Sequence, residues 1–110
     1  MKAFVFIDNT QIGEADLKIT DESMGGIGGM LRPLPGYNNY RQQIQQLFHQ
    51  KGIANVSDFN FSIVLEGGVQ VEAEGGIGVS DSREYPDEIY VESAGVRADI
   101  LEMIAAAGSL

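Results

Sequence analysis

The chain has 110 residues, of which 44% are hydrophobic and 21% charged, with no cysteine and a formal net charge of −9. This length suits a single domain over residues 1–110, and the ordinary balance of apolar and charged residues argues against a disordered or fibrous chain. Disulfides and thiol chemistry are excluded, and direct nucleic-acid binding is disfavoured because so negative a chain repels phosphate.

Membrane insertion and export are also disfavoured. The N-terminal apolar run, Ala3 to Ile7, is too short for the core of a signal peptide and is closed by Asp8. No segment approaches the roughly 18 apolar residues that a transmembrane helix needs. The sequence therefore predicts a cytoplasmic protein with no membrane contact.

The first elements are predicted to be strands. Ala3 to Ile7 is a continuous apolar run bounded by the turn-forming residues 8–10, which indicates a buried strand. From Ile12 to Ile19 apolar and polar residues alternate, which is typical of a strand with one solvated face. The short connection between the two predicts a hairpin.

Two segments, 25–28 and 75–78, share the sequence Gly-Gly-Ile-Gly. A phosphate-binding loop would open onto a helix. The first segment instead leads through Gly-Met-Leu into Arg-Pro-Leu-Pro, and the second leads through Val-Ser into the acidic stretch that begins at Asp81. Glycine within a strand permits a bulge or the close approach of another backbone. We therefore expect two bent or bulged strands near one another, with Ile27 and Ile77 filling the space between them. A mobile apolar flap that includes the neighbouring methionines is the alternative.

A helix is predicted after the turn formed by Pro33, Pro35 and Gly36. Its apolar face consists of residues at helical spacing: Tyr40, Ile44, Leu47 and Phe48. Asn38 or Asn39 is expected to cap its start, and Gly52 is expected to end it in the left-handed conformation.

A second hairpin is predicted around Gly67-Gly68, because two glycines supply the positive φ angles of a tight turn. Alternating residues 59–65 form its first strand. Residues 69–73 form the second, which Ile77 to Ser80 continue past a glycine interruption.

The rest of the chain is predicted to form a loop, a strand and a helix. Residues 81–88 are polar and contain Pro86, Glu88 to Glu92 read as a short strand, and a C-terminal helix closes at Gly108. The apolar face of that helix is Val96, Ile100, Leu101 and Ile104. The sequence thus predicts an α+β fold, with an antiparallel sheet of about five strands and two helices packed on one face.

No assembled catalytic set, metal site or cofactor site is visible. His49 is the only histidine, and it reads as a surface residue near the end of a helix. Two acid pairs, Glu14 with Asp16 and Glu72 with Glu74, each share one face of a strand. Alternating acids on a wet sheet face are common, so we interpret both pairs as solvated surface rather than as ligands.

The negative charge is concentrated late in the chain. Residues 66–102 contain ten carboxylates and two arginines, whereas residues 1–65 contain six acids and five bases. Tyr85 and Tyr90 bracket the acidic loop. Tyrosine rings provide apolar contact area and carboxylates pair with lysine and arginine, so this composition is suited to binding a basic protein surface. The predicted partner-binding residues are Asp81, Glu84, Tyr85, Asp87, Glu88 and Tyr90.

Three hypotheses follow. The leading one is a small acidic, non-enzymatic protein that neutralises a basic protein partner, as immunity and inhibitor proteins do. The alternative is a self-associating structural or accessory protein, a homo-oligomer that uses the Gly/Met segment and the first helix as contacts. The third is a small carboxylate- or metal-dependent enzyme.

Overall fold

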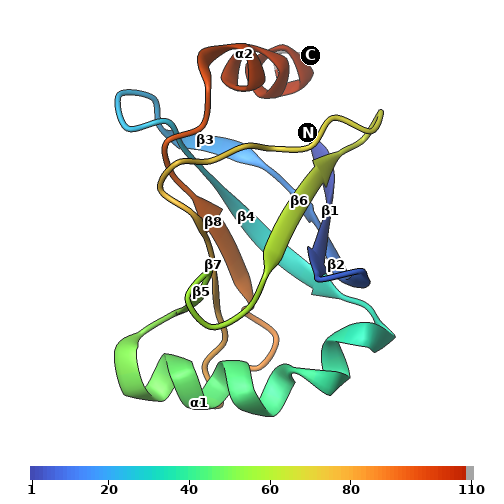
Figure 1. Ribbon diagram of the computed structural model, residues 1–110, viewed down its shortest axis with the longest axis vertical. Helices are drawn as coiled ribbons and strands as arrows, with labels where there is room; N and C mark the ends of the chain where they lie inside the picture. Colours follow the sequence, from blue (N-terminus) through green and yellow to red (C-terminus); the bar gives the residue numbers. More distant parts are fainter. Residues whose placement is uncertain (109–110) are drawn as a thin grey trace.

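Within residues 1–108, eight β-strands form one curled antiparallel sheet, which two α-helices and a 3-10 helix complete (Figure 1). The computed structural model describes residues 1–108. The predicted α+β class is confirmed, with eight strands where about five were expected. The elements are β1 (Lys2–Ile7), β2 (Thr10–Asp16), β3 (Lys18–Asp21), β4 (Gly26–Pro33), η1 (Pro35–Asn39), α1 (Arg41–Lys51), β5 (Ala54–Asn55), β6 (Phe61–Leu65), β7 (Ile77–Ser80), β8 (Tyr90–Ser93) and α2 (Ala98–Gly108).

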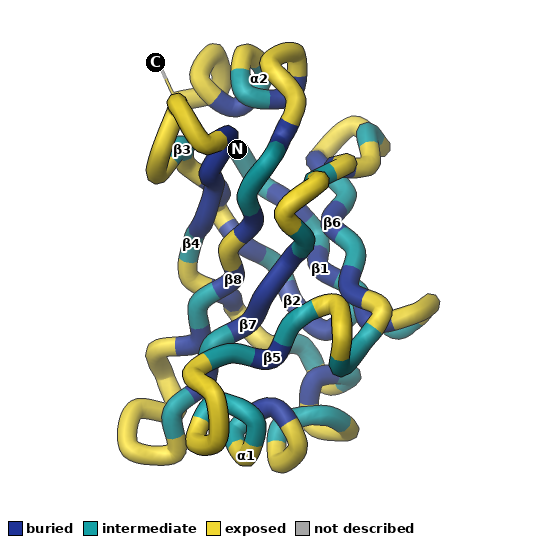
Figure 2. Tube along the Cα trace, turned by 60° about the vertical axis from the view of Figure 1, so that its left-hand side comes forward, coloured by how far each residue is buried: buried dark blue, intermediate teal, exposed yellow. Residues whose placement is uncertain are grey.

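The strands lie in the order β5-β7-β8-β4-β2-β1-β6, and β3 pairs with β4 beyond the end of β2. The curl brings β6 close to β7, although the two lie near opposite ends of this order. Apolar side chains of the concave face form the core, and Figure 2 shows the buried residues running along the strands. Its largest fully buried side chains include Tyr37, Ile63 and Ile89.

The predicted N-terminal hairpin is confirmed. β1 and β2 join through a tight turn in which Ile7 pairs with Thr10 and Asp8 has a positive φ of 51°. Burial alternates along β1, so Phe4 and Phe6 are only half-buried. The predicted buried strand is therefore fully buried on one face only, because the convex face of the curled sheet is partly exposed here.

Both Gly-Gly-Ile-Gly segments run into strands, and these strands flank β8. Ile27 of β4 and Ile77 of β7 pair with the same residue, Ser93. The expectation that the segments lie close together is confirmed, with one strand between them. A bulge lies opposite the first segment, where Thr20 is the extra residue of β3.

The helices occupy opposite ends of the molecule, as Figures 1 and 2 both show. α1 packs against β5 and β7, whereas α2 packs against β3. The expectation that both helices share one face of the sheet is therefore not met, since the curl leaves its two ends to be covered separately.

The predicted end of α1 is confirmed and its predicted start is wrong. Gly52 has a φ of 85°, and its N–H donates to the carbonyl of Phe48 at 2.8 Å. Asn38 and Asn39 do not cap α1. They lie within η1, and Tyr40 is the N-cap without a side-chain bond.

The segment after the Gly67-Gly68 turn does not form the predicted regular strand. The Leu65 N–H donates to the Val69 carbonyl at 2.8 Å and the Val71 N–H to the Ile63 carbonyl at 2.9 Å, and the chain then leaves β6. Ile77 to Ser80 do not continue this segment, because Gly76 has a φ of 81° and turns the chain into a separate strand. Residues 69–71 nevertheless cover the outer edge of β6.

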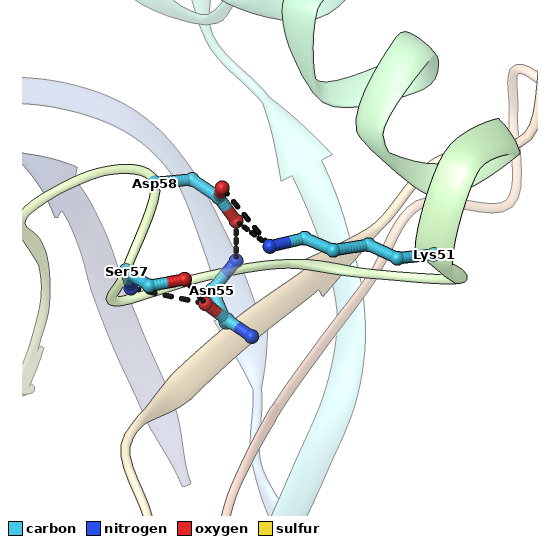
Figure 3. A network of polar contacts seen from close by, with 4 residues as sticks. All are labelled: Lys51, Asn55, Ser57 and Asp58. Carbon is cyan, nitrogen blue, oxygen red and sulfur yellow. Dashed lines mark hydrogen bonds and ion pairs between the residues drawn. The ribbon is translucent and has the colours of Figure 1, made fainter.

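A polar network fixes the loop between α1 and β6 (Figure 3). Lys51 Nζ lies 3.0 Å and 2.8 Å from the two carboxylate oxygens of Asp58, which also accepts the Asn55 N–H at 2.9 Å. Asn55 Oδ1 in turn accepts the N–H and hydroxyl of Ser57. The hydrogen bond from Lys51, followed by that from Asn55, holds the pKa of the Asp58 carboxyl below its usual 3.8.

This network predicts an acid-dependent contribution to stability. A lowered pKa in the folded state stabilises the fold above about pH 3.8, and that contribution is lost as the pH falls through the lowered value. Asp58→Asn should therefore be less stable at neutral pH and should lose less stability between pH 6 and pH 2, as measured by urea unfolding across that range. Asp87→Asn, which removes an exposed carboxylate, is the control. Identical pH profiles for Asp58→Asn and the unmodified protein would contradict the assignment.

Candidate functional site

The loop between β7 and β8 is anchored at both ends. Asp81 and Ile89 are fully buried, and the Leu31 N–H donates to the Ile89 carbonyl at 2.8 Å. Residues 82–88, which we call the acidic loop, contain successive turns: Tyr85 N–H to Ser82 carbonyl at 3.1 Å and Glu88 N–H to Tyr85 carbonyl at 3.0 Å. These bonds give the loop a defined backbone conformation.

Asp81 is held inside the protein by side chains of η1 and α1. The Tyr37 hydroxyl donates to one carboxylate oxygen at 2.6 Å and Gln45 Nε2 donates to the other at 3.3 Å. The Arg41 guanidinium lies 3.9 Å from the same carboxylate and 4.9 Å from the centre of the Tyr37 ring. A buried carboxylate is stable only when such partners replace its hydration.

This arrangement gives Asp81 an internal role. Burial, and then the hydrogen bond to Asp81, raise the pKa of the Tyr37 hydroxyl far above its usual range, so the hydroxyl remains a neutral donor. Asp81 was among the predicted partner-binding residues, but its side chain is 0% exposed. Its carboxylate positions the acidic loop and offers no surface to a partner.

The exposed part of the acidic loop matches the predicted contact chemistry. Glu84, Asp87 and Glu88 are exposed and form no ion pair with any residue of the described range 1–108. Tyr85 projects from among them and is 59% exposed. Arg83 is the single base in the loop.

Tyr90, the last predicted site residue, is half-buried on the convex face of β8. Burial alternates from Glu88 to Glu92, with Ile89 and Val91 inside, so Glu88, Tyr90 and Glu92 share the outer face. The acidic loop therefore leads, at Glu88, directly into the outer face of β8.

A groove of about 440 Å³ separates the acidic loop from α1. Gln45, Phe48 and His49 line one wall, and Ser82, Arg83 and Glu84 line the other. His49 is exposed as expected, but sequence reasoning missed its position beside the loop. Periodicity and composition do not reveal a contact between residues more than 30 positions apart, such as His49 and Ser82. Within residues 1–108 no hydrogen bond joins His49 to Ser82 or Glu84.

The other carboxylates of residues 66–102 are dispersed. Glu72 and Asp99 each lie 3.3 Å from Arg97 near α2, and Glu66 lies in the turn after β6. The concentration of charge in the sequence therefore does not become one patch. The earlier pair, Glu14 and Asp16, contacts Arg32 at 3.8 Å and 3.5 Å.

Within residues 1–108 no cluster of three or more histidine, aspartate or glutamate side chains has the arrangement of a metal site. Neither helix in this range has the length and apolar character needed to cross a bilayer. Comparison of the chain with protein-family models, with curated proteins and with solved structures finds no match.

The buried Tyr37–Asp81 bond predicts a specific loss of stability. Tyr37→Phe removes the donor and leaves a buried carboxylate under-satisfied, which should lower the free energy of unfolding by about 2 kcal/mol. The matched control, Tyr85→Phe, removes an exposed hydroxyl and should change it by less than about 0.5 kcal/mol. Urea unfolding measures both, and equal effects would show that the buried bond contributes nothing.

Proposed function

We propose that this protein is a non-enzymatic binding protein that recognises a basic protein partner through the acidic loop. The observation that carries the proposal is the loop itself. Three exposed carboxylates, which have no ion pair among residues 1–108, accompany an exposed tyrosine on a backbone anchored by buried residues at both ends. The proposal includes a cytoplasmic location and a role in neutralising or regulating the partner.

The chemistry of the loop fits a basic surface. Tyr85 supplies a large, rigid contact area, and tyrosine is enriched among residues that dominate binding energy. Glu84, Asp87 and Glu88 would meet lysine and arginine side chains, and their negative field would accelerate association at low salt.

The anchoring of the loop favours binding over mobility. Asp81 and the turn hydrogen bonds already order residues 82–88 in the free protein. Binding therefore does not have to offset the entropic cost of ordering this loop. The groove beside α1 lies next to the same loop, so Phe48 and His49 extend the surface that a partner would contact.

Self-association is the second candidate, favoured by three exposed apolar side chains: Met24, Met30 and Val56, at 65%, 46% and 54% exposure. Exposed methionine provides an adaptable contact surface. Light scattering over a range of concentrations tests this candidate, and a monomer at every concentration excludes it.

The leading proposal predicts loop-specific, salt-sensitive binding of a basic probe. A 12-residue peptide of alternating arginine and alanine should bind, and binding should weaken steeply as salt rises. Replacing Glu84, Asp87 and Glu88 with their amides should weaken it about tenfold, by removing three charge pairs. Fluorescence anisotropy of the labelled peptide at low and high salt measures both effects.

The matched control removes the same charge elsewhere, by changing Glu66, Glu74 and Glu102 to glutamine. These carboxylates are exposed and form no ion pair within residues 1–108. If the control triple variant weakens binding as much as the loop variant, net charge rather than the acidic loop is responsible, and the proposal fails.

A further inference from the structure

The strand register places glycine on both sides of Glu92. Gly28 of β4 and Gly78 of β7 each pair with Glu92 of β8. Side chains directly opposite one another on neighbouring strands lie close enough to interact, so this is the position from which a basic residue could pair with Glu92. Two glycines offer no side chain, and Glu92 is exposed and forms no ion pair within residues 1–108.

The two glycines also serve packing. A Cβ atom at Gly28 would collide with the Tyr90 ring, and one at Gly78 would collide with the Ile53 side chain. The outer end of the Tyr90 ring therefore lies over Gly28, and the end of the Ile53 side chain lies over Gly78. Glu92 lies on the central strand, β8, and its side chain is exposed to solvent.

Glu92 lies in a surface groove of about 410 Å³, which we call the Glu92 groove. Its floor is the outer face of β4, β8 and β7, Asp21 and Met24 stand on one side, and Ile53 and Asn55 stand on the other. The volume is within the range of about 300–1,000 Å³ typical of ligand sites. The charged residues that line it, Asp21 and Glu92, are both acidic.

The walls of the groove combine apolar surface with fixed charge. Met24 and Ile53 supply the apolar part of the walls, and Met24 is 65% exposed. Asp21 accepts the Ser23 hydroxyl at 2.8 Å and the Met24 N–H at 3.2 Å. These bonds, that of Ser23 first, lower the pKa of the Asp21 carboxyl, which therefore remains ionised at neutral pH.

We propose that the Glu92 groove binds a lysine or arginine side chain of a protein partner, an inference that rests on the proposed function. Lysine and arginine carry a charged head on an aliphatic stem. The head pairs with Glu92, and the stem lies along Met24 and Ile53. Glu88, Tyr90 and Glu92 share one face, so the groove continues the contact surface of the acidic loop.

The test is an amide NMR titration of the full chain with a blocked pentapeptide that has one arginine between glycines. The control peptide carries citrulline, the uncharged isostere of arginine. We expect the arginine peptide alone to shift the amide signals of Gly78, Glu92 and Ala94. Glu92→Gln should weaken these groove shifts roughly three- to fivefold, as expected for an exposed charge pair, and leave the shifts of the acidic loop unchanged.

The matched control variant is Glu66→Gln, which removes one exposed carboxylate from the turn after β6 and should leave the groove shifts intact. Equal weakening by both variants, or equal shifts with citrulline, overturns the inference. Shifts confined to residues 82–88 overturn the groove but leave the proposed function standing. If neither the groove nor the acidic loop responds to the arginine peptide, both proposals fail.

Discussion

The buried hydrogen bond between Tyr37 and Asp81 joins two distant segments of the chain, the 3-10 helix η1 and the loop after β7. Tyr37 belongs to η1 and Asp81 follows β7, so a 2.6 Å hydrogen bond connects elements 44 residues apart. Arg41 and Gln45 add α1 to the same carboxylate, so one residue fixes the 3-10 helix, the helix and the start of the acidic loop. A polar contact inside an apolar core also favours one arrangement, because any shift would leave a buried charge unsatisfied.

Local patterns in the sequence predicted the local structure well. The alternation of residues 61–65, the Gly67-Gly68 turn and the left-handed Gly52 all depend on neighbouring residues, and all are observed. The order of strands and the position of the helices depend on contacts between distant segments, which periodicity does not encode. Thus Ile77 to Ser80 pair with β5 and β8 rather than continuing the second hairpin.

The sequence predicted which residues make up the acidic loop, but it did not predict which of their side chains are exposed or which residues surround them. Counting charge along the chain located the acidic loop, yet Asp81 looks identical to its neighbours until Tyr37, Arg41 and Gln45 surround it. The repeated glycine motif was visible in the sequence, whereas its consequence for Glu92 was not. That consequence arises only because β4 and β7 bring the two copies to the same register on opposite sides of β8.

The irregular segment 69–71 has an effect beyond its own hydrogen bonds. An uncovered strand edge is a template on which further chains can add, and proteins commonly obstruct such edges to remain soluble. Residues 69–71 exchange backbone hydrogen bonds with β6, and the chain then turns away from the strand. They therefore cover the free edge of β6 without adding a further regular strand to the sheet. The sheet is thereby protected at this end from open-ended growth into aggregates.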